Sequence, residues 1–351
     1  MAQRHLHAPL AGSSPVIPPT SRDGSCVAAV DARLDNRAEL IANLGLESDA
    51  GAIGDDAIVL HAWLRWGTSC PEHLLGDFAF AIWDPRRRRL FCARDHLGCR
   101  PLYYHLGPRI AAVASDTSTL IAVAGVPDHL DEVRVAGFLV PGFADRTRTF
   151  YGGISRLPAA HALVVEAERG ESPSEYWSLD PGREHPAASD AEHAEAFRAL
   201  FTESVRARLR GTSPAVAALS GGLDSSSVVC VARELRRASG VLPLETWSAR
   251  FPSLPGCDEG AYIASVVEQG DILSREIRGD RLDPLGDLER GFPAGQDTLH
   301  GAGYYMHEAL YRAARGTGAV VFLEGMTGDA VVSHGTGYLR SLLHGGRWLT
   351  L

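Results

Sequence analysis

The stretch AVAALSGGLDS, residues 215–225, joins a short apolar run to a segment with helical spacing. The apolar run ends at Leu219, and apolar residues recur after the turn at Val228, Val229, Ala232 and Leu235. A strand that turns tightly through glycines into a helix presents backbone N–H groups and the positive end of the helix dipole to an anion. The stretch therefore predicts a phosphate-binding loop between a buried strand and a helix.

The side chains of this loop indicate what else the phosphate site needs. Gly221 and Gly222 are expected to take positive φ and to bring the backbone close to a phosphate oxygen, while Ser220 and Ser225 add hydroxyl groups. A carboxylate facing a phosphate is repulsive unless a cation lies between them, so Asp224 predicts a bound Mg²⁺. No Lys follows the glycines, which excludes the Walker pattern G-x-x-x-x-G-K-[ST].

A second stretch, GAVVFLEGMTGD at residues 318–329, has a similar organisation. Its apolar run, Ala319 to Leu323, predicts another buried parallel strand, and ligands of doubly wound sheets bind outside the carboxyl ends of such strands. Asp329 is therefore expected to face Asp224 across the nucleotide, with phosphate oxygens and water completing the Mg²⁺ shell. Gly325 is expected to contact the nucleotide.

The first loop resembles the pyrophosphate loop of the ATP-pyrophosphatases, which cleave ATP between its α and β phosphates and transfer AMP. Three upstream segments closely resemble the glutaminase-like half of the asparagine synthetase family: DARLDNRAEL (31–40), GDFAFAIWDPRRRRLFCARDHLGCRPLYYH (76–105) and TFYGGISRLPAAHAL (149–163). The resemblance covers nearly the whole chain from about Cys26. Within the family, the second loop together with VVSHG (331–335) and GRWLTL (346–351) is most similar to the lasso-peptide cyclases, which form macrolactams.

The resemblance implies a fold and a domain organisation. An incomplete α+β sandwich of the N-terminal nucleophile hydrolase type, residues 1–180, is expected to precede an α/β doubly wound parallel sheet of the adenine nucleotide α-hydrolase type, residues 190–351. The segment Leu179 to Asp190, rich in proline and charge, reads as the linker. In the predicted strand Glu245 to Phe251, Ser248 and Ala249 match the adenine-contacting stretch of the family, and Leu219 to Ser225 match its pyrophosphate loop.

Several positions depart from the family pattern. Glutaminases of the family use an N-terminal Cys, whereas here Ala2 follows Met1, and Cys26 lies inside an apolar strand-like run. Residues 31–33, Asp-Ala-Arg, stand where glutaminases have Asn-Gly-Glu, so we expect glutaminase activity to be lost. Met326 replaces an acidic residue of asparagine synthetases, which predicts a more apolar pocket that suits a peptide.

The ends of the chain also differ from the family pattern. Family members begin several dozen residues before the point that matches Cys26 and continue well beyond the point that matches Leu351. The C-terminal part carries a Lys that stabilises the adenylate and pyrophosphate charges, and no residue here matches it. We therefore expect a truncated chain or a fragment whose catalytic competence depends on what supplies that part.

Composition is typical of a two-domain protein that works in the cytoplasm. The chain has 351 residues, 45% of them hydrophobic, and a net charge of −9, which gives no general attraction to nucleic acid or to an anionic membrane. No 18-residue apolar run and no signal-peptide core is present. The six cysteines form no C-x-x-C pair, which predicts free thiols. The four arginines at 86–89 predict a solvated hairpin turn, and His334 is a candidate substrate contact.

The expected activity is ATP-dependent amide-bond formation through an acyl-adenylate, with ATP and Mg²⁺ as cofactors. The substrate is then a peptide or amino-acid carboxylate. The cyclase resemblance implies a precursor peptide, whose Asp or Glu side chain is activated and closed by its own N-terminal amine, and proteins that process its leader. Three alternatives stay open: an asparagine synthetase that uses free ammonia, a non-catalytic nucleotide-binding relative, and AMP transfer to nucleic acid, which the acidic charge disfavours.

Overall fold

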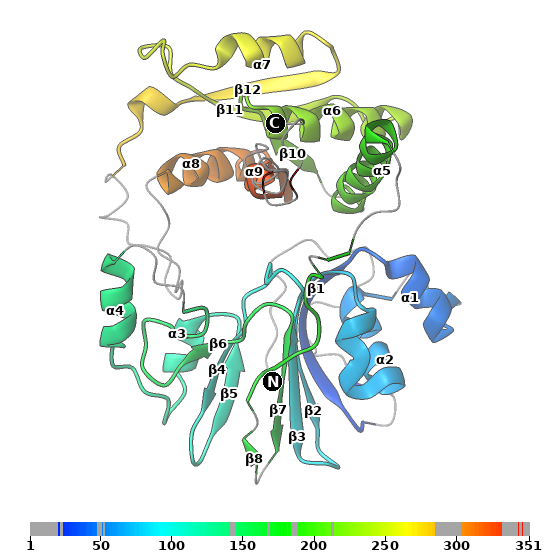
Figure 1. Ribbon diagram of the computed structural model, residues 1–351, viewed down its shortest axis with the longest axis vertical. Helices are drawn as coiled ribbons and strands as arrows, with labels where there is room; N and C mark the ends of the chain where they lie inside the picture. Colours follow the sequence, from blue (N-terminus) through cyan, green and yellow to red (C-terminus); the bar gives the residue numbers. More distant parts are fainter. Residues whose placement is uncertain are drawn as a thin grey trace. The chain divides into compact units, whose positions relative to one another are not determined.

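The computed structural model describes residues 20–21, 24–47, 51, 53–140, 145–166, 169–170, 172–180, 182–183, 189–211, 214–284, 303–331, 343 and 346. The chain divides into two compact units, Met1–His185 with Arg290–Leu299 and Pro186–Glu289 with His300–Leu351. Figure 1 shows the elements of each unit. Within the described ranges, no helix is long and apolar enough to cross a membrane.

The first unit is built on an antiparallel sheet with the order β1-β2-β3-β7-β8, in which β9 also pairs with β7. A second sheet has the order β5-β4-β6. The strands are β1 (Val27–Leu34), β2 (Gly76–Asp84), β3 (Arg89–Arg94), β4 (Tyr103–Leu106), β5 (Ala111–Ala114), β6 (Ser155–Arg156), β7 (His161–Glu166), β8 (Arg169–Gly170) and β9 (Ser174–Glu175). The helices are α1 (Arg37–Leu44), α2 (Asp55–Trp66), the 3₁₀ helix η2 (Gly67–His73), α3 (Thr117–Ile121) and α4 (Glu132–Leu139).

Alternation along β2 explains how the layers of this unit stack. Successive side chains of a strand point to opposite faces of the sheet, and in β2 large residues alternate with alanines. Phe78, Phe80 and Ile82 belong to one core cluster together with residues of α1 and α2. Ala79 and Ala81 belong to another, which includes residues of the second sheet and of the segments beside it. The small alanines therefore lie between the two sheets, while the large side chains fill the space under the helices.

The outer face of the second sheet is covered by α3, because Tyr103 of β4 and Leu120 of α3 share a third core cluster. The unit is therefore a four-layer sandwich of helices, sheet, sheet and helix, seen side by side in the lower part of Figure 1. This arrangement confirms the predicted α+β sandwich. The β2–β3 hairpin is also confirmed, with Arg86 to Arg88 exposed at its turn and the Arg89 guanidinium over the Trp63 ring.

The second unit is built on a parallel sheet with the order β12-β11-β10-β13. Its strands are β10 (Ala215–Ala218), β11 (Leu244–Arg250), β12 (Ile272–Arg278) and β13 (Val321–Leu323). Its helices are α5 (Asp190–Arg208), α6 (Leu223–Ala238), α7 (Gly260–Val267), the 3₁₀ helix η3 (Gly279–Arg281), α8 (Tyr304–Arg315) and α9 (Gly328–Val331). The strand β13 starts two residues later than the sequence predicts, because the chain turns at Gly318 with φ +81° before it enters the sheet.

The strand order fixes where this unit can bind a ligand. From β10 the chain runs outward to β11 and β12 on one side, and it then returns to β13 on the other side of β10. In Figure 1, α6 and α7 cover one face of the sheet, and α8 lies on the other. The predicted doubly wound sheet is therefore confirmed, and its topological switch point lies between β10 and β13.

Candidate nucleotide site

The first predicted loop lies at this switch point. Ala217 of β10 pairs with Leu323 of β13, so the loops that follow the two strands leave the same edge of the sheet side by side. Ser220 is exposed, and α6 begins three residues later with the carboxylate of Asp224 in its first turn. The position of the loop agrees with the rule that open α/β sheets bind ligands outside the carboxyl ends of their strands.

The predicted positive φ of Gly221 and Gly222 is wrong. Gly222 has φ −74°, and Gly221 is not among the residues with positive φ. Gly221 is instead required by packing, since a Cβ there would lie 2.7 Å from the Cβ of Glu259 and 2.9 Å from the Cβ of Tyr262. The first turn of α7 therefore rests directly on the loop backbone.

Two serines fix the loop from beneath. The buried hydroxyl of Ser225 lies 2.8 Å from the Ser220 hydroxyl, and it accepts a hydrogen bond from the Ser220 N–H at 3.1 Å. The hydroxyl of Ser248 is buried and donates to the carbonyl of Leu219 at 2.6 Å. Ser248 thus holds the end of β10 in place. An adenine contact at Ser248 and Ala249 remains a prediction, and it would involve their backbone atoms.

The second predicted loop packs against the first. A Cβ at Gly325 would lie 2.6 Å from the Ser225 backbone nitrogen, and one at Gly328 would lie 2.3 Å from the Oδ2 atom of Asp224. Only glycine allows the two loops to approach this closely. Asp329 is exposed and directly follows Gly328, the residue that contacts Asp224.

The donor set at this junction fits a magnesium ion. Asp224 is half-buried and Asp329 is exposed, and Mg²⁺ is usually bound by one or two carboxylates together with phosphate oxygens and water. Within the described part of the chain, no group of three His, Cys, Asp or Glu side chains could hold a metal ion. The metal assignment therefore depends on oxygens that the nucleotide would supply.

Two acidic residues beside the loops are not among the predicted site residues. Glu259 accepts a hydrogen bond from the Gly221 N–H at 3.0 Å, and Glu324, at the end of β13, accepts from the Tyr311 hydroxyl at 3.0 and 2.9 Å. Asp258 and Glu259 precede an apolar helical pattern, which is a typical start of a helix, and this signal could have drawn attention to them. The pairing of Glu324 with α8 leaves no pattern in the sequence.

Apolar side chains are exposed on both loops. Leu223 is 85% exposed and Met326 is 51% exposed. Their exposure agrees with the prediction that Met326 makes this edge more apolar than an acidic residue would. His334, the other predicted substrate contact, lies outside the described residues.

The positions of the first unit that resemble those of glutaminases make structural contacts. Cys26 is buried in the core beneath the helices, and its N–H donates to the Ser21 hydroxyl at 2.9 Å. Asp31 lies 3.6 Å from the guanidinium of Arg100. Asp95 accepts hydrogen bonds from the N–H groups of Cys99 and Arg100, so the RDHLG segment acts as a structural turn. Cys26 is therefore a core residue and Asp31 lies beside a cation, while the loss of glutaminase activity stays a prediction.

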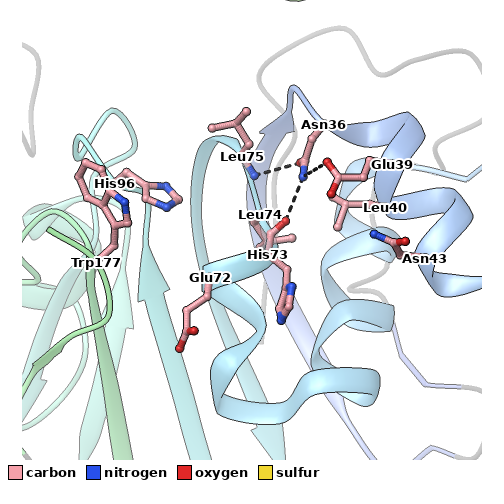
Figure 2. Close-up of a pocket in the computed structure, with 10 residues that line it drawn as sticks. All are labelled: Asn36, Glu39, Leu40, Asn43, Glu72, His73, Leu74, Leu75, His96 and Trp177. Atoms are coloured by element: carbon pink, nitrogen blue, oxygen red, sulfur yellow. Dashed lines mark hydrogen bonds between the residues drawn. The ribbon is translucent and has the colours of Figure 1, made fainter. Parts of the chain in front are cut away.

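A separate cavity of about 280 Å³ opens in this unit, shown in Figure 2. Asn36 forms one wall, where its amide donates to the His73 carbonyl and accepts from the Leu75 N–H. The described residues around the cavity are Asn36, Glu39, Leu40, Asn43, Glu72, His73, Leu74, Leu75, His96 and Trp177. None of these described residues is a Cys, Ser or Thr, so they offer no hydroxyl or thiol nucleophile.

The six cysteines are free, as predicted. Cys26, Cys70 and Cys92 are buried, Cys230 is partly buried, and Cys99 and Cys257 are exposed. Burial raises the pKa of the Cys92 thiol to about 12. A thiol with such a pKa stays protonated at neutral pH and is a poor nucleophile.

Two family matches divide the chain in the same way as the two units. Residues 11–177 match the glutamine amidotransferase domain, and residues 196–350 match asparagine synthase. Asparagine synthetase [glutamine-hydrolyzing] 3 of Bacillus subtilis is 31% identical over 198 residues, which are 56% of this chain and 32% of that protein. Amidase chyE of Penicillium rubens is 30% identical over 251 residues, which are 68% of this chain and 37% of that protein. The chain spans about a third of the length of these relatives.

Proposed function

The chain belongs to the asparagine synthetase family, and on this premise we propose that it takes part in ATP-dependent amide-bond formation through an acyl-adenylate, with release of AMP and pyrophosphate. The observation that carries the proposal is the packing of Gly328 against the Asp224 carboxylate. This contact joins the loop after β10 to the loop after β13 at the switch point of the sheet. Doubly wound domains bind ligands at this position of the sheet, which supports the proposal.

The chemistry follows from the leaving group. A carboxylate does not react with an amine, because oxide would have to leave, so the acid is first joined to the α-phosphorus of ATP and pyrophosphate departs. The N–H groups at the start of α6 would donate to the phosphoryl oxygens and stabilise their charge. Asp224 and Asp329 would hold Mg²⁺, which when bound neutralises pyrophosphate as a Lewis acid. An amine then displaces AMP from the acyl carbon.

For the substrate we favour a peptide that is closed into a macrolactam. The exposed Leu223 and Met326 give this edge of the site an apolar surface, which suits peptide side chains better than a small charged amino acid. When both reacting groups belong to one peptide, the second step becomes unimolecular, an advantage of up to about 7–11 kcal/mol in favourable cases. The precursor peptide and the proteins that process its leader are then the partners of the chain, and the cytoplasm is where we expect it to act.

An asparagine synthetase reaction with free ammonia is the second candidate. It is favoured by the similarity to asparagine synthetase 3 of Bacillus subtilis. It would use the same loops and the same two aspartates, and it differs only in the acid and the amine. A non-catalytic nucleotide-binding role is the third candidate, and it predicts binding without turnover.

An ATP–pyrophosphate exchange assay separates the three candidates. The protein is incubated with the candidate peptide from neighbouring coding sequence, with aspartate and ammonia, or with neither, and exchange and product are measured. We expect exchange and a dehydrated cyclic product with the peptide alone. Exchange that depends on aspartate, with asparagine as product, would establish the second candidate, and nucleotide binding without exchange would establish the third.

Two variants test the metal assignment in the same assay. Asp224→Asn keeps the shape of the side chain and removes its charge, and we expect it to lower exchange by at least about 100-fold, in the range of lost electrostatic groups in active sites. Glu268→Gln removes an exposed carboxylate at the far end of α7 and should leave exchange unchanged. Exchange that survives Asp224→Asn would refute the role of Asp224.

A further inference from the structure

A carboxylate already occupies one of the backbone N–H groups of the phosphate loop. The Gly221 N–H donates to the Oε2 atom of Glu259 at 3.0 Å. Gly221 lies in the loop expected to bind phosphate, and a carboxylate oxygen accepts from an amide in the same way as a phosphate oxygen does. Glu259 therefore stands where an anionic ligand of the loop would make one of its contacts.

The position of Glu259 is fixed by the residue before it. Asp258 accepts two hydrogen bonds from the Arg250 guanidinium, both at 2.8 Å, and a third from the Phe251 N–H at 2.9 Å. These bonds tie the start of α7 to the carboxyl end of β11 without any help from Glu259. Anchoring of the helix is thus already accounted for, which leaves the Glu259 side chain for another role.

The Arg250 guanidinium near the start of α7 pairs with Asp258 and Glu276 and not with Glu259. The side chain is exposed, and in the part of the chain that the structure describes no Arg, Lys or His forms an ion pair with it. The Asp224 carboxylate belongs to the same loop region, on the first turn of α6. A polyphosphate that enters the loop is therefore repelled by the Glu259 carboxylate, which already accepts the Gly221 N–H that the polyphosphate would bind.

We infer that Glu259 competes with phosphate for the Gly221 N–H and must be displaced when a polyphosphate binds. The contact is exposed and a single neutral amide donates it, so displacement requires only a side-chain rotation and leaves the Asp258–Arg250 anchor in place. Glu259 then weakens binding of phosphate groups that arrive without enough compensating contacts, and it makes the loop selective for ligands that also make contacts elsewhere in the site. The inference deepens the proposed function, because it rests on this loop being a polyphosphate site.

Calorimetric titration of the whole chain with pyrophosphate tests the inference. Glu259→Gln removes the charge and keeps the length of the side chain, and we expect it to bind pyrophosphate about threefold to tenfold more tightly than the wild type, as expected for loss of one nearby repulsive charge in a partly solvated site. Glu259→Ala should bind at least as tightly as Glu259→Gln. Glu268→Gln, on the same helix, should match the wild type, and adenosine, which carries no phosphate, should bind all four proteins equally.

A second readout follows the amide itself. In ¹⁵N-labelled protein, the Gly221 N–H resonance should move upfield in Glu259→Ala, and pyrophosphate should return it downfield. Unchanged or weaker pyrophosphate binding by Glu259→Gln in a folded protein would overturn the inference even if the wild type makes amide bonds. If no variant binds pyrophosphate, the inference and the proposed function both fail, whereas tighter binding without ligase activity would uphold the inference and refute the catalytic proposal.

Discussion

Single atoms decide whether the candidate site can form. Gly328 approaches the Asp224 carboxylate so closely that a methyl group at this position would lie 2.3 Å from both Cγ and Oδ2. Real Cβ atoms do not come this near to another heavy atom, so the two loops could not keep their contact. The same contact also determines where the Asp224 carboxylate can point.

Gly328→Ala should therefore damage the site more than the fold. We expect a loss of about 1–3 kcal/mol in stability from the forced shift, together with a loss of pyrophosphate binding, because the Asp224 side chain has to move. Gly256→Ala is the matched control, since no atom lies within 4 Å of a Cβ built there and its φ is not positive. Thermal unfolding and calorimetry measure both effects, and wild-type affinity in Gly328→Ala would show that the loop contact is dispensable.

Asp258 gives a second prediction at the residue scale, which concerns pH. The hydrogen bond from Arg250 is the main cause that lowers the pKa of Asp258 from its ordinary value of 3.8 to about 2. Because the folded pKa lies below the unfolded one, the ionised carboxylate stabilises the fold above about pH 4, and this contribution is lost as the pH falls towards 2. Asp258→Asn should therefore be less stable than the wild type at pH 6. The difference in the free energy of unfolding should be smaller at about pH 2.5 than at pH 6.

Urea unfolding at a series of pH values measures this difference between the two proteins. An NMR titration of the Asp258 carboxyl carbon gives the pKa directly. A gap that stays constant from pH 6 to pH 2.5 would contradict the prediction, since it would mean that the charge of Asp258 does not contribute.

At the scale of elements, the β2–β3 hairpin allows two contributions to stability to be compared: the charges of its arginines and the hydrogen bonds of its turn residue Asp84. The Asp84 Oδ1 atom accepts the N–H groups of Arg86 and Arg87 at 3.0 and 3.1 Å, so one side chain organises the turn. The arginine side chains of residues 86–88 are exposed, and the Arg87–Asp84 ion pair is only at 4.0 Å. Exposed ion pairs of this kind contribute little to stability.

Asp84→Ala should thus destabilise the first unit by about 1 kcal/mol, the usual net value of lost side-chain-to-backbone hydrogen bonds. The double variant Arg86→Ser, Arg87→Ser should change stability by no more than about 0.5 kcal/mol. Urea midpoints of the two variants give the comparison. A larger loss in the arginine variant would assign a specific role to the basic turn.

The bounds of the elements can be predicted from the sequence, whereas contacts between distant segments cannot. Strands β10 and β11 lie within one residue of their predicted bounds, because hydrophobic period and glycine turns are local signals. The prediction that Gly221 is needed for positive φ is wrong. Glycine is needed there because the start of α7 packs against it, and Glu259 at that start lies 38 positions away along the chain. No local pattern reveals which segment will cross above a loop, and the contacts of Glu259 and Glu324 were missed for the same reason.

At the scale of the whole molecule, the two units have separate cores. Phe80 lies in a cluster formed by β1, β2, β3 and the helices α1 and α2, whereas Val229 lies in a cluster of β10, β11, β13 and the helices α5, α6 and α7. The clusters share no residue. The sequence predicts the hairpin that contains Phe78 to Ala81, but only the assembled layers show that the helices cover the Phe side and the second sheet covers the Ala side.

Separate cores predict that damage to one unit leaves the other intact. Phe80→Ala should destabilise the first unit by about 3–5 kcal/mol and leave pyrophosphate affinity within about twofold, since sites without shared contacts are additive. Val229→Ala, on α6 in the same core cluster as Leu219, should cost about 2 kcal/mol and should also weaken pyrophosphate binding. Hydrogen exchange followed by mass spectrometry assigns each loss of protection to its unit, and calorimetry gives the affinity. Equal weakening of pyrophosphate binding by both variants would mean that the first unit supports the candidate site energetically, which separate cores do not predict.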